Sequence, residues 1–368
     1  MNNRLILTFI LGLFLASCAQ IPMGAFNSYR DAFTAARTAS EAVLTEHEKT
    51  EKIQQERKAA FQASQGNPQP PFPEHFDPKK EIENAGKKSG IEERLAAWDV
   101  ISRYNDALLA LAEGQTPTQL SGSFTALGKS LDTFAGSLGA SIPGLGPVFS
   151  VADTILKVAE QERVRREFNR ALKAGEPVVM KIIDFYIDET QYYYGLRRSQ
   201  TVVAMAGQKR QVRNYAKQMY ILSRDYKEPA KDSDEGKSKS AIRKQMAEIM
   251  AAVGLPANIS TTQNGVKEKW AALEGKGSQP YTRIVDTQLL QFIQAAKSNV
   301  AAYQAQEKNL VAYYKALGEY TLVLQKLKTI LETLLVSADT PMPLTSTAET
   351  VLRTALKVKS QIDALETP

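Results

Sequence analysis

The chain has 368 residues, with 46 Lys and Arg against 40 Asp and Glu, one cysteine and two histidines. This length allows a sizeable hydrophobic core, and the mild positive charge does not indicate a nucleic-acid-binding protein. The single cysteine excludes an intramolecular disulfide and a metal site built from cysteines. Two histidines leave few ways to build a catalytic triad.

The first 18 residues have the pattern of an export signal. Arg4 precedes a short apolar stretch, 5–14, which is too short for a helix that crosses a bilayer. The next four residues, Leu15-Ala16-Ser17-Cys18, are an aliphatic residue, two small residues and a cysteine. This motif resembles the lipobox of bacterial lipoproteins. The resemblance implies cleavage after Ser17 and lipid attachment to the sulfur of Cys18.

The resemblance also implies a location and a first partner. Residues 1–17 are expected to be removed as a signal peptide, and fatty acid such as palmitate on Cys18 is expected to hold the mature protein to a lipid bilayer. The second residue of the mature chain is Ala19 rather than Asp. In this respect the chain is similar to lipoproteins that reach the outer membrane of Gram-negative bacteria. In the periplasm the positive charge would meet anionic lipid or peptidoglycan rather than nucleic acid. A plain secretory signal with an incidental cysteine is the alternative.

Residues 18–66 are expected to hold the anchor and a first helix. Its second half, 45–60, is highly charged, so we expect that half to face solvent. Five prolines between positions 68 and 78 predict a stiff, extended loop over 67–88. In the first half, residues suited to packing on another helix recur at intervals of three and four, at Phe26, Tyr29, Phe33, Ala36, Ser40 and Val43.

Residues 89–368 are predicted to form a helical body. Helical spacing first recurs from Ile91 to Leu111, and another helix is expected from about Pro117. Glu176-Pro177 has the pattern of a helix start, because proline is tolerated in the first turn, and this long helix should run to about Lys227.

A second long helix is expected from about Tyr281 to Ser337, and a final helix from Ser346 to Leu365. Two short helices, one ending near Val253 and one containing Trp270, are expected between the long ones. No segment has a convincing strand pattern. The predicted fold class is therefore all-α, an elongated bundle with long antiparallel, coiled-coil-like helices.

One stretch of the body, 133–152, contains twenty residues and no charge. Its glycines and prolines favour a hairpin that turns at Pro143-Gly144 over a straight helix. Two interpretations stay open: a hairpin that dips into a membrane, similar in layout to the apolar tongue of α-helical pore-forming toxins, or a tightly packed turn within the bundle. The apolar residues that would meet lipid or core are Phe134, Leu138, Ile142, Leu145, Val148 and Phe149.

Three consecutive tyrosines, Tyr192, Tyr193 and Tyr194, are followed by Arg197 and Arg198. Consecutive residues of a helix point in different directions, so the three rings cannot all be buried. They fit an interface with a partner, since tyrosine is amphipathic and favoured at contacts. They fit equally well one ring in the core with the other two packed along neighbouring charged side chains.

No pattern of catalytic, cofactor-binding or metal-binding residues stands out. Glu46-His47-Glu48 begins like a zinc-protease helix, but Glu51 occupies the place of the second histidine. His47 is therefore expected on a charged, solvated helix face. Pairs of carboxylates that meet only in space leave a cell-wall hydrolase as a third hypothesis.

The sequence favours a non-enzymatic, lipid-anchored envelope protein. We expect a helical scaffold or interaction module at the membrane surface, with a protein partner or a second copy of the chain bound to it. The alternative is a membrane-active helical protein that uses the hairpin at 133–152.

Overall fold

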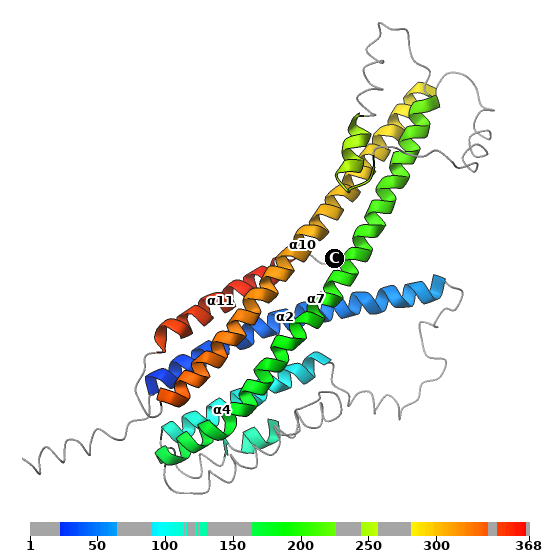
Figure 1. The fold of residues 1–368 in the computed structure, drawn as a ribbon. Helices are drawn as coiled ribbons and strands as arrows, with labels where there is room; N and C mark the ends of the chain where they lie inside the picture. The colour runs from blue at the N-terminus through cyan, green and yellow to red at the C-terminus, as the bar shows by residue number, and fades with distance from the viewer. Residues whose placement is uncertain are drawn as a thin grey trace, which may run out of the picture. The chain divides into compact units, whose positions relative to one another are not determined.

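The computed structural model is shown in Figure 1. It describes residues 23–64, 90–113, 115, 122–123, 125–130, 164–225, 244–256, 281–337 and 344–365, and these contain helices and turns but no strand. The prediction of an all-α helical bundle is confirmed. The main helices are α2 (Met23–Ser64), α4 (Gly90–Ala112), α7 (Val164–Asp225), α10 (Tyr281–Ser337) and α11 (Thr345–Asp363).

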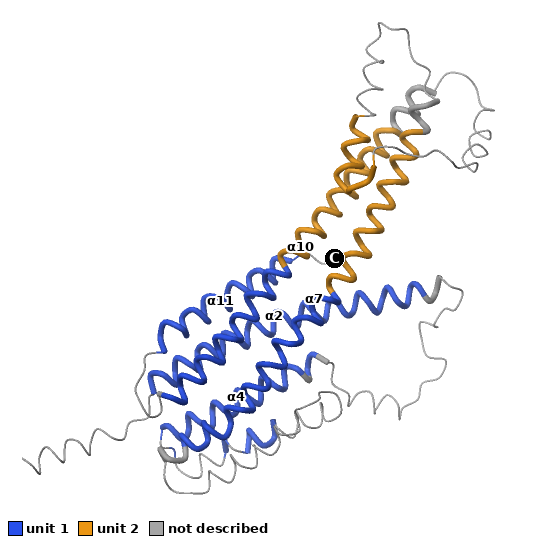
Figure 2. Tube along the Cα trace, in the orientation of Figure 1, with its two compact units in different colours: residues 1–196, 313–365 blue, residues 197–312, 366–368 orange. Residues whose placement is uncertain are grey.

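The chain divides into two compact units, coloured separately in Figure 2. Unit 1 comprises residues 1–196 and 313–365, and unit 2 comprises residues 197–312 and 366–368. The long helices α7 and α10 contribute to both units, whereas α2, α4 and α11 belong to unit 1 alone. The division into segments 18–66 and 89–368 stays a prediction.

The core of unit 1 is rich in aromatic rings. Phe26 of α2 lies edge-on to Phe168 of α7, with ring centroids 5.5 Å apart. The Trp98 indole of α4 contacts Phe33 of α2 at 5.3 Å and stacks on Tyr186 of α7 at 5.1 Å. These contacts pack α2, α4 and α7 against one another, and apolar burial of this kind is the main stabilising term of a bundle.

The other helices of unit 1 complete the bundle. The buried face of α11 packs on α2 through Ala348, Val351, Ala355, Val358 and Ile362. Two contacts pair α7 with α10: Asp184 with Lys328, and Tyr194 with Tyr314. Along α7 the numbers rise while along α10 they fall, so the two helices are antiparallel within unit 1.

The first half of α2 is buried as the sequence predicts, with Phe26, Tyr29, Phe33, Ala36, Ser40 and Val43 all at 3 % exposure or less. The prediction that 45–60 faces solvent is wrong at its beginning. Glu46, His47 and Thr50 are buried, and exposed positions predominate only from residue 51 onward. The buried positions continue the spacing of three and four from Val43, so the packed face of the helix extends one turn into the charged segment.

The start of α7 differs from the prediction. The helix begins at Val164, and Pro177 lies inside it rather than in its first turn. An interior proline removes one helical hydrogen bond and costs about 3 kcal/mol. The apolar face nevertheless continues across it, because Leu172 before the proline and Val179 after it are both buried.

A tyrosine of α4 packs against the turn that precedes this proline. The Tyr104 hydroxyl donates to the carbonyl oxygens of Ala171 and Leu172, 3.1 Å away in each case. Its ring passes so close to Gly175 that any side chain there would overlap it. Glycine at 175 thus leaves room for the ring. Buried packing around this turn offsets the free-energy cost of the interior proline.

Unit 2 has its own core. Val212, Ala216 and Met219 of α7 pack with Ile293 and Ala296 of α10 and with the short helix 244–251. This helix ends where the sequence predicts, near Val253. Gly254 has φ +63°, and the amide of Leu255 donates to the carbonyl of Met250, which is the usual way a glycine closes a helix.

Candidate functional site

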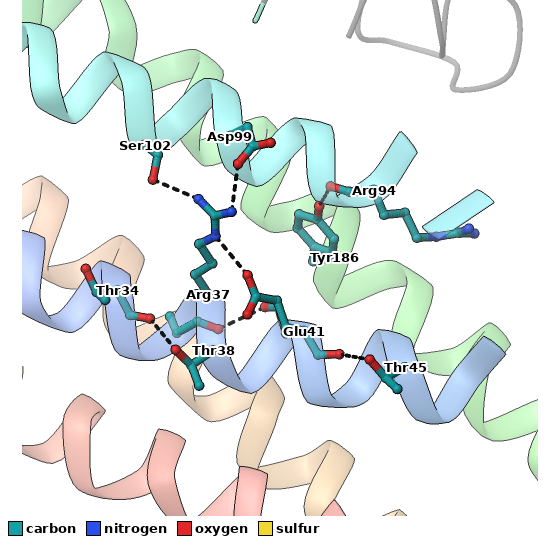
Figure 3. Close-up of polar contacts among 11 residues, drawn as sticks. Thr34, Arg37, Thr38, Glu41, Thr45, Arg94, Asp99, Ser102 and Tyr186 are labelled. Carbon is teal, nitrogen blue, oxygen red and sulfur yellow. Dashed lines mark hydrogen bonds and ion pairs between the residues drawn. The ribbon is translucent and has the colours of Figure 1, made fainter. Parts of the chain in front are cut away.

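Arg37 and Arg94 are among the residues that link the helices of unit 1. Arg37 of α2 lies between α2 and α4 (Figure 3), where its Nη2 is 2.7 Å from Asp99 Oδ1 and its Nη1 donates to Ser102 Oγ at 3.1 Å. Its Nε donates to Glu41 one turn further along α2, at 3.0 Å. Because these groups are half exposed, water screens them and the contacts add little to stability.

The second arginine is more deeply placed. Arg94 of α4 makes a two-pronged contact with Glu189 of α7, from Nε to Oε2 and from Nη2 to Oε1, each at 2.6 Å. The two side chains are only 16 % and 15 % exposed. This geometry is the strong form of an arginine–carboxylate pair, and in a low-dielectric setting it fixes α4 against α7.

Tyrosines surround this ion pair. The Tyr193 hydroxyl donates to Glu189, and the guanidinium of Arg94 lies 5.8 Å from the centre of the Tyr193 ring. The Tyr186 hydroxyl donates to the backbone carbonyl of Arg94, as Figure 3 shows. Burial is the first cause that raises the pKa of Tyr193, with the charge of Glu189 next, so its hydroxyl stays protonated and serves as a donor.

His47 of α2 closes the cluster from a third helix. Its ring centroid lies 4.4 Å from that of Tyr193 and 5.3 Å from that of Tyr192, and its Nε2 is 3.2 Å from Glu51 Oε1. The side chain is fully buried, so the expectation of a solvated histidine is wrong. Burial, followed by the positive charge of Arg94, lowers the pKa of His47 to about 4, against a smaller opposite effect of Glu189. The imidazole is therefore neutral near pH 7.

The tyrosine run is divided as helical geometry requires. Tyr193 is buried in the cluster, whereas Tyr192 is 52 % exposed and its hydroxyl donates to Glu51 at 3.4 Å. Tyr194 lies edge-on to Tyr314 of α10 at 5.5 Å. The prediction that the three rings cannot share the core is confirmed, and the partner interface remains a prediction.

The two arginines that follow the tyrosine run differ in their exposure to solvent. Arg197 is 1 % exposed, whereas Arg198 is exposed. A buried arginine costs free energy unless other groups satisfy it, so its burial could not be expected from the sequence. Only Arg198 of the pair presents its charge to solvent as an interface residue would.

The sequence did not single out Arg94 or Glu189, although together they organise the cluster. The spacing of Tyr186, Glu189 and Tyr193, at three and four, was a usable signal that these residues share one face of α7. Their partner on α4 is 95 positions away from Glu189, and no local pattern connects the two. We name the set His47, Glu51, Arg94, Tyr186, Glu189, Tyr192 and Tyr193 the polar–aromatic cluster.

The arrangement of the polar–aromatic cluster is suited to joining helices. Arg94 is paired with Glu189, the three tyrosine hydroxyls donate to protein acceptors, and the one histidine is neutral. Within the part of the chain that the structure describes, no group of three or more His, Cys, Asp or Glu side chains is placed to hold a metal ion. A hollow of about 510 Å³ lies apart from this cluster, between α4 and residues 126–130, and is lined by Glu92, Leu95, Asp99, Arg103 and Lys129.

Several predicted features lie outside the described residues. These are Cys18 with its signal segment, the proline-rich loop at 67–88, the helix around Trp270, and the apolar hairpin at 133–152. Among the helices that are described, none is long and apolar enough to cross a membrane. A comparison of this chain with protein-family models, curated proteins and solved structures finds no match.

Proposed function

We propose that this protein is a lipid-anchored envelope protein that acts as a helical scaffold or interaction module at a membrane surface. The observation that carries the proposal is the motif Leu15-Ala16-Ser17-Cys18, which contains the one cysteine of the chain and follows a short apolar segment. A cysteine in this position is the acceptor for lipid in proteins that carry the motif.

The position of α2 supports a close link between this anchor and the body. Helix α2 begins at Met23, five residues after Cys18, and these residues can span at most about 18 Å. Phe26, in the first turn of α2, is already buried in the core of unit 1. In the proposed arrangement, unit 1 is therefore held close to the lipid surface rather than at the end of a long linker.

The packing of unit 1 supports a scaffold more than a mobile catalytic device. Helices α2, α4, α7, α10 and α11 share one core, and the polar–aromatic cluster adds an ion pair and tyrosine hydrogen bonds that fix α4 against α7. Such packing holds exposed helix faces at constant positions, which is what a binding surface needs.

The anchor can be tested in bacterial cells with the full-length chain. The cells receive an alkyne analogue of palmitate, and membranes are separated from soluble material. We expect the wild-type protein to carry the label and to sediment with membranes, whereas Cys18→Ser carries no label and retains its signal segment. Ser17→Ala is the matched control, because it replaces one small residue of the motif with another and leaves the acceptor sulfur in place. Equal labelling of the wild-type and C18S proteins would refute the anchor.

The uncharged stretch at 133–152 supports a second candidate, a membrane-active protein. The purified protein is added to vesicles that contain a quenched dye. If the hairpin enters lipid, Leu145→Asp should abolish dye release while the helical circular dichroism stays unchanged. If the wild-type protein releases no dye at any concentration that binds vesicles, this candidate is wrong.

A further inference from the structure

The positive charge of the chain is concentrated in unit 2, which Figure 2 shows in orange. This unit contains 19 Lys and Arg against 11 Asp and Glu, whereas unit 1 contains 27 against 29. On α7, the stretch from Arg197 to Tyr220 holds six of these cations and no carboxylate. An ion pair on a helix surface joins residues three or four positions apart, so none can form within this stretch. The exposed cations of the stretch are therefore not neutralised by their own helix.

Three of these cations share one outward face of α7 with apolar side chains. The arginines of this face are exposed and its lysine is partly exposed. Its two valines are 49 % and 60 % exposed. The six positions of the face fall within about 100° of the helix circumference, and Val212 and Met219, which are buried in the core of unit 2, lie on the other side. We name these six residues the basic face of α7: Val202, Val203, Ala206, Arg210, Arg213 and Lys217.

The other helices of unit 2 do not neutralise the basic face either. Among the side chains of unit 2 that the structure describes, Glu248 and Glu307 are the only carboxylates, and neither forms an ion pair with this face. Cations without a carboxylate partner keep their full attraction for an anion outside the molecule. Two of the three are arginines, whose planar fork of donors matches the oxygens of a phosphate group. Charge complementarity therefore indicates a partner that presents several phosphate groups.

We propose that the basic face of α7 binds an anionic lipid surface, with its three cations at the phosphate groups and its valines between the headgroups. The exposed valines favour lipid over a soluble polyanion such as a nucleic acid. Aliphatic side chains beside cations gain free energy when they leave water at a bilayer interface. A nucleic acid is instead bound by cations together with aromatic rings that stack on its bases. The basic face has no aromatic ring, and Tyr215 of the same stretch packs against Phe292 of α10.

This lipid contact does not rest on the proposed anchor. The basic face belongs to unit 2, whereas α2, which follows Cys18, belongs to unit 1. A chain that starts at Ala19 keeps every helix that the structure describes, since the first of them begins at Met23, and it contains no cysteine. The tests use this chain, so that lipid on Cys18 cannot hold the protein to a vesicle. Failure of the anchor and failure of the basic face are thus separate results.

Sedimentation with vesicles measures the contact. At low salt, we expect the chain to bind vesicles that contain phosphatidylglycerol at least about tenfold more tightly than vesicles of phosphatidylcholine alone, and to lose this preference at about 1 M salt. The double variant R210Q/R213Q should bind the anionic vesicles about 25-fold more weakly, because each cation near an anionic membrane contributes about fivefold. The matched control is K297Q/K308Q, an equal change of charge at exposed positions of α10, which should cost less than about threefold. Equal losses in the two variants, or equal binding to the two kinds of vesicle, would overturn the proposal.

A short DNA duplex serves as the soluble polyanion for comparison. Val203→Ser should weaken binding to anionic vesicles about threefold, because the apolar side chain leaves water only at a bilayer. The same variant should bind DNA as the unchanged chain does. If DNA is bound as tightly as anionic vesicles at the same salt, or if V203S leaves vesicle binding unchanged, the face is a general polyanion site and the proposed lipid contact is wrong.

A dye on the face reports directly which side of unit 2 meets lipid. Ala206→Cys, within the basic face, gives the tested chain one thiol, and this thiol is coupled to a dye whose emission rises in apolar surroundings. Gln304→Cys, at an exposed position of α10, is the matched control. On addition of anionic vesicles, the dye at 206 should brighten at least about twofold and the dye at 304 should stay unchanged. A rise at 304 alone, or at neither position, would overturn the proposal.

Discussion

The burial of His47 makes the stability of unit 1 dependent on pH. The pKa of this imidazole is about 4 in the folded protein, against an ordinary value of 6.5. The unfolded chain therefore binds a proton at a higher pH than the folded chain does. Stability from this group is fully present above pH 6.5 and is lost as the pH falls from 6.5 towards 4.

The magnitude follows from the two pKa values. At pH 4.5 the unfolded chain is almost fully protonated at His47 and the folded chain only about one quarter protonated, so the loss is about 2.5 kcal/mol relative to neutral pH. The groups that face the ring belong to all three helices packed around it: Glu51 of α2, Arg94 of α4, and Glu189, Tyr192 and Tyr193 of α7. Their own titration contributes to acid sensitivity, so the histidine must be isolated by comparison with a variant.

The assay is urea unfolding followed by tryptophan fluorescence at pH 7.5 and pH 4.5. Trp98 lies in the core of unit 1, and the chain has one other tryptophan, so Trp270→Phe makes the signal specific for that unit. His47→Phe keeps an aromatic ring and removes the titrating group. Between the two pH values, the W270F protein should lose about 2.5 kcal/mol more free energy of unfolding than the W270F/H47F protein.

A direct measurement of the imidazole completes the test. The chain has two histidines, so the resonances that disappear in H47F identify His47 by NMR. We expect its titration midpoint near pH 4. If the midpoint lies at 6 or above, or if both proteins lose the same free energy on acidification, the imidazole is not held neutral by burial and the reasoning fails.

Two further predictions concern helix contacts of unit 1, and both are measured by urea unfolding in the W270F background. Gly175→Ala should lower the free energy of unfolding by about 2 kcal/mol, because the new methyl group overlaps the Tyr104 ring, and Tyr104→Leu should remove most of that loss in the double variant. A loss below about 0.5 kcal/mol would mean that the ring does not approach the glycine. Glu189→Ala should cost about 3 kcal/mol because Arg94 loses its two-pronged carboxylate partner, and a cost below 1 kcal/mol would show that water solvates the pair.

The elements that could be predicted from the sequence are those whose signals are local. Helix α10 begins and ends at the predicted residues, Tyr281 and Ser337, because its spacing is uninterrupted and turn-forming residues flank it. The short helix of unit 2 ends near Val253 for the same reason, with Gly254 as its stop signal. A local pattern is sufficient where no distant residue changes the outcome.

The two clear errors have distant causes. The sequence predicts the start of α7 at Pro177 because a proline inside a helix is costly on its own. It shows nothing of Tyr104, which packs from α4 against the preceding turn. The sequence predicts a solvated face for His47 because its neighbours in sequence are charged. Its actual neighbours in space, Arg94 and Tyr193, come from two other helices, so no spacing within α2 could reveal them.

The proposed anchor and the polar–aromatic cluster both involve unit 1, and this gives the proposed function a physical basis. Helix α2 begins five residues after Cys18 and holds both Phe26 in the core and His47 in the polar–aromatic cluster. In the proposed arrangement, one continuous helix thus connects the lipid to the packed body. A short link limits how freely the body can rotate at the surface, so a partner that binds there loses less orientational freedom than one that binds a freely diffusing protein. In the proposed arrangement, the exposed helix faces of unit 1 are therefore better suited to a partner at the same surface than to one in solution.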